Sequence, residues 1–395
     1  MKKAILIVLD SVGIGASPDA ALYGDETAHT LNHITAYYAS HHLPFALSAL
    51  TSLGLGRITG VEGLGDVSEP LKGSFYGRLS EASKGKDTVT GHWEMTGIIT
   101  NTPFPVYPQG FPPEMVEAFE KVAATKILGN VPASGTEIIE RLGKAHLESG
   151  YPIVYTSADS VWQIAAHEEV IALDTLYHYC EIARELFKEP PHNIGRIIAR
   201  PFVGDLGHFT RTANRKDYAL KPQRQNVLCD LITHGQDVHA IGKISDIFAD
   251  TCMTSSVHTT SNDDGMRQLL ARYPQLTNGL LFLNLVDFDS RCGHRRDPYG
   301  YGQALLAFDQ QLSALCQQLD SETLLIITAD HGCDPTAPGT DHTREYVPVL
   351  LYQPGGLISA PLSDAHGFGH IGATLAQYLG VPYSGSGQNL LPSLS

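Results

Sequence analysis

Short, uniformly apolar runs recur along this sequence, and each of them ends at polar residues. The runs cover residues 4–9, 280–286, 323–328 and 347–352. Runs of this length and uniformity are typical of strands that are buried on both faces of a parallel sheet. Helical patterns lie between them, for example at residues 301–319, where apolar side chains recur at helical spacing. Alternating strands and helices predict an α/β fold with a doubly wound, mostly parallel sheet.

Acidic and histidine residues follow three of these runs, and further histidines lie close behind. They are Asp10, Asp289, His294, Asp330, His331 and His342. Ligands of doubly wound sheets bind outside the carboxyl ends of the strands, so these side chains are expected to converge there. A single Asp after a strand is often only a helix cap, and the segment around Asp330 taken alone could be a simple strand-to-turn junction. The full set is much harder to explain in that way.

The chemical types in this set point to metal ions. Three carboxylates and three imidazoles are suited to Zn²⁺ or Mn²⁺. One ion would leave some of these ligands unused, whereas two neighbouring ions would share them. Two ions can also hold a bridging nucleophile, which is the arrangement for in-line displacement at phosphorus. The sequence therefore predicts a two-metal phosphoryl-transfer enzyme.

A hydroxyl nucleophile for such chemistry is offered by residues 85–94, where small residues precede an expected helix. A helix beginning there would present free backbone N–H groups to a phosphate. Thr88 is a weak nucleophile at its ordinary pKa, but coordination to a metal can convert it to an alkoxide. Two alternatives stay open, namely that Thr88 is only the N-cap of the helix or that Thr90 supplies the hydroxyl.

The middle of the chain has a different character. A Pro-rich stretch begins near residue 101 and indicates a linker that leaves the first unit. The elements expected after it are helices at residues 113–128, 136–148 and from Asp174 to about 188, and strands at 153–156 and 196–202. We therefore predict a core domain of residues 1–100 and 222–395, with residues 101–221 forming a smaller inserted α+β cap domain that covers the active site.

Charge and composition argue against several classes of protein. The 395 residues carry a formal net charge of −15, which disfavours nucleic acid or an anionic membrane as a partner. No apolar run approaches the roughly 20 residues that span a bilayer, and the short apolar start is interpreted as a buried strand rather than a signal peptide. The six cysteines form no C-x-x-C pair and are expected to be reduced thiols of a cytoplasmic protein. No obligate protein partner is evident.

Several segments of the chain together resemble one family. They are residues 10–15, 86–94, 287–297, 329–332 and 341–343, with 155–160 and 198–203 in the inserted part. Their sequences are similar to those of bacterial phosphopentomutases, within the wider alkaline phosphatase superfamily. The resemblance covers essentially the whole chain, and no candidate ligand or nucleophile position departs from the family pattern.

The resemblance implies a role for each candidate residue. In this family a phosphorylated Thr bridges two metal ions, which assigns Asp10, Asp330 and His331 to one ion, Asp289, His294 and His342 to the other, and Thr88 to both. The matching substrate contacts are Ser157, Asp159, Arg196, Arg211 and Lys243.

The resemblance also implies a reaction and its cofactors. The reaction is the isomerisation of ribose 1-phosphate or 2-deoxyribose 1-phosphate to the 5-phosphate, through a phospho-Thr88 enzyme and a bisphosphate intermediate. The cofactors are two divalent ions, Mn²⁺ first and Zn²⁺ second, with a sugar bisphosphate such as glucose 1,6-bisphosphate as activator.

Rival interpretations remain at this stage. A metal-dependent phosphatase, or a cofactor-independent phosphoglycerate mutase with its serine nucleophile, would share the superfamily ligand pattern. A non-catalytic metal-binding protein would also hold the ions. The G-x-G-x-x-G at residues 367–372 lacks a preceding strand and a later acidic residue on a second strand, so it indicates the start of a final helix rather than a nucleotide site.

Overall fold

A computed structural model of the chain describes residues 1–65, 69–157, 159–222 and 224–392. By the contacts between its Cα atoms the chain divides into two compact units. The larger unit comprises residues 1–102 and 222–395, and the inserted unit comprises residues 103–221.

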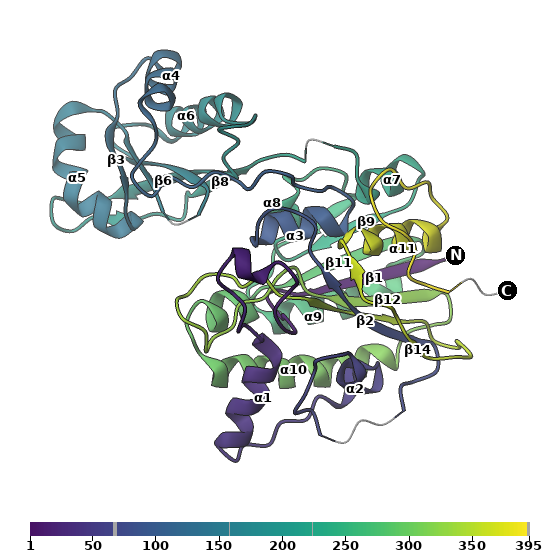
Figure 1. The fold of residues 1–395 in the computed structure, drawn as a ribbon. Coiled ribbons are helices and arrows are strands. Elements are labelled where there is room, and N and C mark those ends of the chain that lie inside the picture. The colour runs from purple at the N-terminus through teal and green to yellow at the C-terminus, as the bar shows by residue number, and fades with distance from the viewer. Residues whose placement is uncertain (66–68, 158, 223, 393–395) are drawn as a thin grey trace. The chain divides into compact units, whose positions relative to one another are not determined.

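The larger unit is built on one mixed sheet (Figure 1). In spatial order its strands are β10 (Ser255–Val257), β9 (Val238–Ile241), β11 (Gly279–Leu285), β1 (Lys3–Leu9), β12 (Thr323–Thr328), β13 (Val347–Tyr352), β2 (Ser74–Ser80) and β14 (Ala360–Pro361), and β15 (Ala365–His366) also pairs with β2. The strands from β10 to β12 run parallel, whereas β13 is antiparallel to both of its neighbours. The predicted mostly parallel sheet is confirmed.

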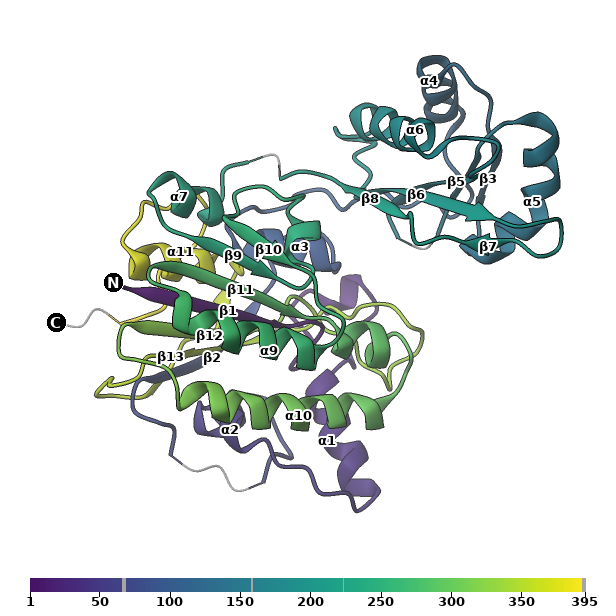
Figure 2. The same cartoon turned by 180° about the vertical axis from the view of Figure 1, so that it is seen from behind.

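Helices cover both faces of this sheet, as Figures 1 and 2 show. One face carries α1 (Thr30–Ser40), α2 (Ser48–Ser52), α9 (Asn262–Arg272) and α10 (Pro298–Cys316). The other face carries α3 (Thr88–Met95), α7 (Val227–Thr233), α8 (Ile244–Ile247) and α11 (Gly369–Leu379). This coverage explains why β11 and β12 are buried along their whole length and are rich in apolar residues.

The register of the central strands brings their carboxyl ends to one edge of the sheet. β1 lies between β11 and β12, with Leu9 opposite Leu285 and Val8 opposite Thr328. β2 is antiparallel to β13, and β13 is antiparallel to β12, so β2 also ends at this edge. The chain segments that follow these four strands therefore meet at a single place.

The inserted unit has a second, six-stranded sheet. Its strands are β3 (Leu128–Pro132), β4 (Ile153–Thr156), β5 (Val161–His167), β6 (Arg196–Val203), β7 (Thr210–Arg211) and β8 (Lys216–Ala219). Its helices α4 (Pro113–Ala123) and α6 (Leu173–Leu186) pack on one face around Trp162, while α5 (Gly135–Ser149) packs on the other (Figure 2). Each face has its own apolar cluster, so the unit has a core that is independent of the larger sheet.

The inserted unit differs from the prediction at the end of α4, at the start of α6 and in four strands that were not predicted. The helix α4 ends at Ala123 rather than at residue 128, because Ala124 adopts a left-handed conformation with φ of 50°. The N-cap of α6 is Ala172, and Asp174 instead lies in the first turn, where its charge favours the helix dipole. The strands β3, β5, β7 and β8 were not predicted.

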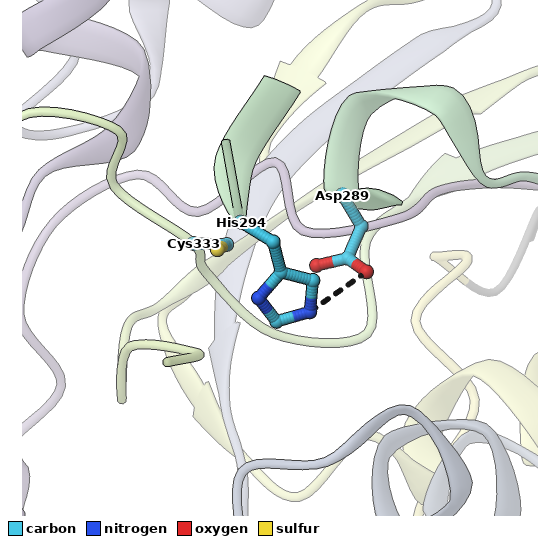
Figure 3. Close-up of side chains that lie close together, drawn as sticks. All are labelled: Asp289, His294 and Cys333. Carbon is cyan, nitrogen blue, oxygen red and sulfur yellow. Dashed lines mark ion pairs between the residues drawn. The ribbon is translucent and has the colours of Figure 1, made fainter. Parts of the chain in front are cut away.

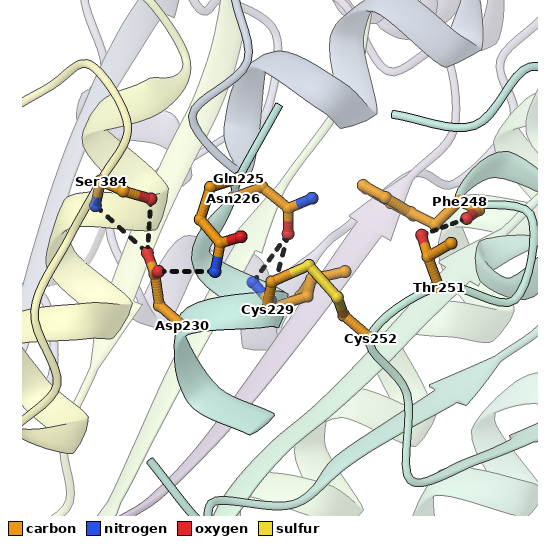
Figure 4. Close-up of a disulfide and its surroundings, with 9 residues drawn as sticks. Gln225, Asn226, Cys229, Asp230, Phe248, Thr251, Cys252 and Ser384 are labelled. Carbon is orange, nitrogen blue, oxygen red and sulfur yellow. Dashed lines mark hydrogen bonds between the residues drawn. A yellow bond between two sulfur atoms is a disulfide. The ribbon is translucent and has the colours of Figure 1, made fainter. Parts of the chain in front are cut away.

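One pair of cysteines corrects the expectation that all six are reduced. Cys229 on α7 and Cys252, just after α8, form a disulfide with their Cα atoms 4.8 Å apart (Figure 4). The other four cysteines are free thiols. The two cysteines are separated by 23 positions in the sequence. They come together only because α7 and α8 pack on the same face of the sheet, so local spacing could not have revealed the disulfide. No helix in the described part of the chain is both long and apolar enough to cross a membrane.

Candidate two-metal site

The first cluster of candidate ligands is formed where β1 and β12 end. His331 Nε2 lies 3.2 Å from Asp330 Oδ2 and 3.6 Å from Asp10 Oδ1. All three residues are buried. The backbone N–H of Ser11 donates to Asp330 Oδ1 over 3.0 Å, and His331 Nδ1 donates to the carbonyl of Gly332. The second bond leaves Nε2 as the ring nitrogen that faces the carboxylates.

The second cluster follows β11, where a single π-helical turn, Phe288–Gly293, carries Asp289 and is closed by His294. His294 Nε2 lies 3.2 Å from Asp289 Oδ2, and His342 Nε2 lies 3.4 Å from Asp289 Oδ1. Figure 3 shows the imidazole of His294 beside the carboxylate of Asp289. His294 Nδ1 donates to the carbonyl of Thr340 over 2.6 Å, so Nε2 again faces the carboxylate.

The two clusters are adjacent. The rings of His331 and His342 have centroids 4.0 Å apart, and donor atoms of Asp289, His331 and His342 all lie within 4.8 Å of one another. The structure therefore brings all six predicted ligands together. A donor atom of Cys333 is also within 4.8 Å of donor atoms of Asp289 and His294, and the sequence analysis did not single out this thiol (Figure 3).

Buried atoms without hydrogen-bond partners mark this place as one built for cations. They are Asp10 Oδ1, Asp289 Oδ1, Asp330 Oδ2 and His342 Nε2. Leaving such groups unsatisfied costs on the order of 1–3 kcal/mol each, and more where the group is charged. Divalent ions bound among these oxygens and nitrogens would satisfy them, and the mixture of carboxylate and imidazole suits such ions. The donor set therefore fits two metal ions.

The pKa values at the site show how the protein balances its carboxylates without ions. Burial, with Asp330 and Asp289 nearby, raises the pKa of Asp10 well above its usual range. Burial also opposes ionisation of Asp289, but its close contacts with the imidazoles of His294 and His342 outweigh that effect and lower the pKa of the carboxyl. The hydrogen bond to Asp289 in turn raises the pKa of His294 to about 11. Metal ions bound here would replace the protons that the raised pKa values of Asp10 and His294 favour.

Thr88 is the first residue of α3, and its hydroxyl faces the first cluster. Thr88 Oγ1 lies 3.1 Å from His331 Nε2. The N-cap is Asp87, whose Oδ1 accepts from the N–H groups of Val89 and Thr90. These two amides are therefore not free for a phosphate, which corrects that part of the prediction. Thr90 is buried, and its hydroxyl donates to the carbonyl of Asp87, so Thr88 is the hydroxyl of the two that faces the site.

Two supporting residues were missed by the sequence analysis. Asn284 on β11 donates from its side-chain amide to Asp10 Oδ2 over 3.0 Å. His92 lies one turn after Thr88 on α3, with Nδ1 2.9 Å from the carbonyl of Thr88 and 3.3 Å from Asp330 Oδ2. An amide inside an otherwise apolar strand was a visible signal for the first. The position of His92 four residues after Thr88 was the signal for the second.

The five candidate substrate contacts are divided between the units. The inserted unit carries Ser157, Asp159, Arg196 and Arg211, while Lys243 in the larger unit precedes α8. Ser157 lines a pocket of about 490 Å³ near the start of α5. Arg196 pairs with Asp217 over 3.8 Å. The ammonium of Lys243 favours the ionised form of Asp10, which places it within electrostatic reach of the first cluster.

The fold and the paired clusters define the class of this protein, a metalloenzyme with a doubly wound α/β core. Residues 2–383 match the model of the metalloenzyme superfamily. The structure of PH0037 protein from Pyrococcus horikoshii has the same fold, with a TM-score of 0.50 and 11% identity over 96% of this chain and 97% of that chain.

Sequence relatives narrow the class further. A phosphopentomutase from Caldanaerobacter subterraneus subsp. tengcongensis is 50% identical over 394 residues, which cover 100% of this chain and 98% of the relative. A phosphopentomutase from Dictyoglomus thermophilum is 48% identical over 100% of this chain and 99% of the relative. The chain therefore belongs to the phosphopentomutase family of the metalloenzyme superfamily.

Proposed function

We propose that this enzyme is an isomerase that interconverts ribose 1-phosphate and 2-deoxyribose 1-phosphate with the corresponding 5-phosphates. The observation that carries the proposal is the position of Thr88 Oγ1, 3.1 Å from His331 Nε2 beside the two ligand clusters. Full-length identity of 50% to a phosphopentomutase supports the choice of substrate class.

Asp10, Asp330 and His331 would hold one divalent ion, and Asp289, His294 and His342 the other. Bound there, the ions would neutralise charge on a phosphoryl group and favour the ionised form of the Thr88 hydroxyl. We propose Mn²⁺ as the physiological metal, with Zn²⁺ as the alternative that the same ligands accept.

Thr88 carries the phosphoryl group between the two positions of the sugar. The P–O bond to Thr88 breaks as a bond to the free hydroxyl of the pentose phosphate forms, which gives a sugar bisphosphate. The other phosphoryl group of that bisphosphate then returns to Thr88, and a sugar bisphosphate such as glucose 1,6-bisphosphate charges Thr88 at the start. Arg196, Arg211 and Lys243 supply cationic contacts for the phosphate that is not reacting, while Ser157 and Asp159 can hydrogen-bond the sugar.

Phospho-Thr88 would be hydrolysed if water had free access to it. We propose that the inserted unit excludes water during phosphoryl transfer.

A cytoplasmic location of the protein also remains a prediction.

A product assay separates this proposal from its rivals. The protein is incubated with Mn²⁺, a trace of glucose 1,6-bisphosphate and ribose 1-phosphate, and both ribose 5-phosphate and free phosphate are followed. Ribose 5-phosphate is expected to form faster than free phosphate. A metal-dependent phosphatase would release mainly free phosphate, and a phosphoglycerate mutase would turn over phosphoglycerate instead.

A pair of threonine variants tests the nucleophile. Thr88→Ala should abolish turnover while both metal ions remain bound, because six other side chains supply the ligands. Thr90→Ala, the matched control, removes a hydroxyl that is turned toward Asp87 and should keep most of the activity. Activity in the Thr88→Ala protein would contradict the assignment.

A further inference from the structure

The segment that leads to Thr88, residues 81–87, has no regular secondary structure, although much of it is buried. Its backbone groups therefore need hydrogen-bond partners from elsewhere in the protein. Because this segment ends at Thr88, those partners also determine where the Thr88 hydroxyl lies.

One buried guanidinium holds the carbonyl groups of this segment. The side chain of Arg344, which is 1% exposed, donates to the carbonyls of Gly85 over 2.6 Å, Glu81 over 2.8 Å and Ser83 over 3.0 Å. It also pairs with the carboxylates of Glu81 and Asp19. A planar guanidinium can make these bonds at once because its five N–H groups point in fixed directions, which a single ammonium cannot match.

A buried carboxylate holds the amide groups of the same segment. Glu94 on α3 accepts from the N–H groups of Ala82, over 2.8 Å, and of Ser83, and also from that of Phe368. The segment is thus held by a cation at its carbonyls and by an anion at its amides.

Arg344 also belongs to the stretch that carries a candidate metal ligand. His342 lies two residues before it, and Thr343 exchanges two backbone hydrogen bonds with Gly332, beside His331. Asp341 lies 3.3 Å from the ammonium of Lys86 in the segment itself. The ligand-bearing stretches and the segment that ends at Thr88 are therefore joined through one continuous set of contacts.

We propose that Arg344 is a positioning residue for phosphoryl transfer, which acts by fixing residues 81–87 so that Thr88 stays aligned with the two metal clusters. Glu94 completes this function by accepting hydrogen bonds from the amides of the same segment. The inference rests on the proposed function, because it assumes that Thr88 carries the phosphoryl group. Alignment matters because a displacement of about 1 Å in a reacting group can cost on the order of 10²-fold in rate.

Arg344→Lys tests the proposal, because lysine keeps the positive charge but lacks the planar set of N–H groups that bonds several carbonyls at once. The variant should phosphorylate Thr88 from glucose 1,6-bisphosphate roughly 10²-fold more slowly, as measured by intact mass in a single turnover. Its kcat should fall by a similar factor, while its KM and its content of two metal ions per chain stay close to those of the wild type. Arg344 does not touch any of the six ligands through its side chain, so a change in metal content is not expected.

Arg78→Lys is the matched control. Arg78 lies on β2 in the same unit, and its side chain pairs with Asp364 over 2.7 Å, donates to the carbonyl of Thr59 over 3.1 Å and lies over the ring of Tyr346, so these partners are all outside residues 81–87. This variant should phosphorylate Thr88 at close to the wild-type rate.

A second variant guards against a folding defect. Glu94→Gln keeps the shape of the side chain but weakens its hydrogen bonds with the amides of Ala82 and Ser83. This variant should therefore also slow phosphorylation of Thr88, by a smaller factor than Arg344→Lys. The proposal is overturned if Arg344→Lys and Glu94→Gln both phosphorylate Thr88 at the wild-type rate. It is also overturned if the activity of these two variants falls only in proportion to the metal that they have lost. Failure of the proposed function would show instead in the wild-type protein, as free phosphate in place of ribose 5-phosphate.

Discussion

At the scale of single residues, the site consists of candidate metal-ligand atoms that the protein holds in position, and some of these atoms have no hydrogen-bond partner. In both His294 and His331, Nδ1 donates a hydrogen bond to a backbone carbonyl and Nε2 faces a carboxylate. Asn284 donates a hydrogen bond to one oxygen of Asp10, and the other oxygen accepts no hydrogen bond. This pattern is what a metal site requires, because ligands that are held before the ion arrives need little rearrangement.

Metal binding should depend on pH through His294. Its pKa is raised to about 11, chiefly by the hydrogen bond to Asp289, so the metal-free protein carries an imidazolium there at neutral pH. That ion pair stabilises the metal-free fold fully below pH 6.5, and its contribution is lost as the pH rises through about 11. A bound ion must displace the proton, so we expect affinity for Mn²⁺ to rise by up to about tenfold per pH unit for each displaced proton.

Calorimetric titration with Mn²⁺ in two buffers of different ionisation enthalpy measures this proton release. His366→Gln serves as the control, because His366 contacts Ser80 rather than either cluster. Binding that releases no protons near neutral pH would contradict the expectation.

The amide of Asn284 should contribute to metal affinity. Asn284→Leu fits the apolar strand but removes the donor to Asp10, and loss of such a partner typically weakens binding by about 10–100-fold. A metal titration followed by calorimetry should show the loss at one of the two ions. Thr328→Val is a matched control, since Thr328 is buried in the same row of the sheet and its hydroxyl donates to Ala329 rather than to a ligand. Equal affinity in both variants would contradict the role of Asn284.

At the scale of elements, apolarity predicted the buried strands well but not their direction. The strands at residues 323–328 and 347–352 are confirmed with those bounds, yet β13 runs antiparallel to β12. Burial on both faces selects the same residues in either direction, whereas direction depends on how the connecting segment folds. The bonds of Asp87 to the first turn of α3 were likewise not visible, because several residues before that helix could have served as its cap.

The disulfide between α7 and the segment after α8 makes a simple prediction. Denatured protein that was purified without reductant should show four reactive thiols, and reduction should raise the number to six. The measurement is a thiol titration with a chromogenic disulfide reagent. In Cys229→Ser the unreduced chain should show five thiols, because Cys252 loses its partner. Six thiols in the unreduced wild type would mean that this bond does not form in the purified protein.

At the scale of the whole molecule, each unit has its own sheet and its own apolar core. All six candidate metal ligands and Thr88 lie in the larger unit. The two tryptophans are divided between the units, with Trp93 on α3 in the larger one and Trp162 in the core of the inserted one. Their fluorescence can therefore report on each unit separately.

Metal ions should stabilise one unit and not the other. In Trp162→Phe the remaining Trp93 should report a higher unfolding midpoint with Mn²⁺ than with a chelator, because the ions bind only the folded larger unit. At about 100 times the dissociation constant the gain is roughly 2.7 kcal/mol per ion. In Trp93→Phe the midpoint reported by Trp162 should not move. A common shift in both variants would mean that the two units unfold as one.

Local chemistry in the sequence was sufficient to predict the class of fold and the six candidate ligands, because strand apolarity and residue type are properties of short segments. It could not identify Arg344 or Glu94, whose partners lie more than ten positions away, nor the pairing of Cys229 with Cys252. It favoured Thr88 as the nucleophile but left Thr90 open as an alternative. Only the tertiary structure separates them, because the direction of a hydroxyl depends on how residues 81–87 are held against distant segments.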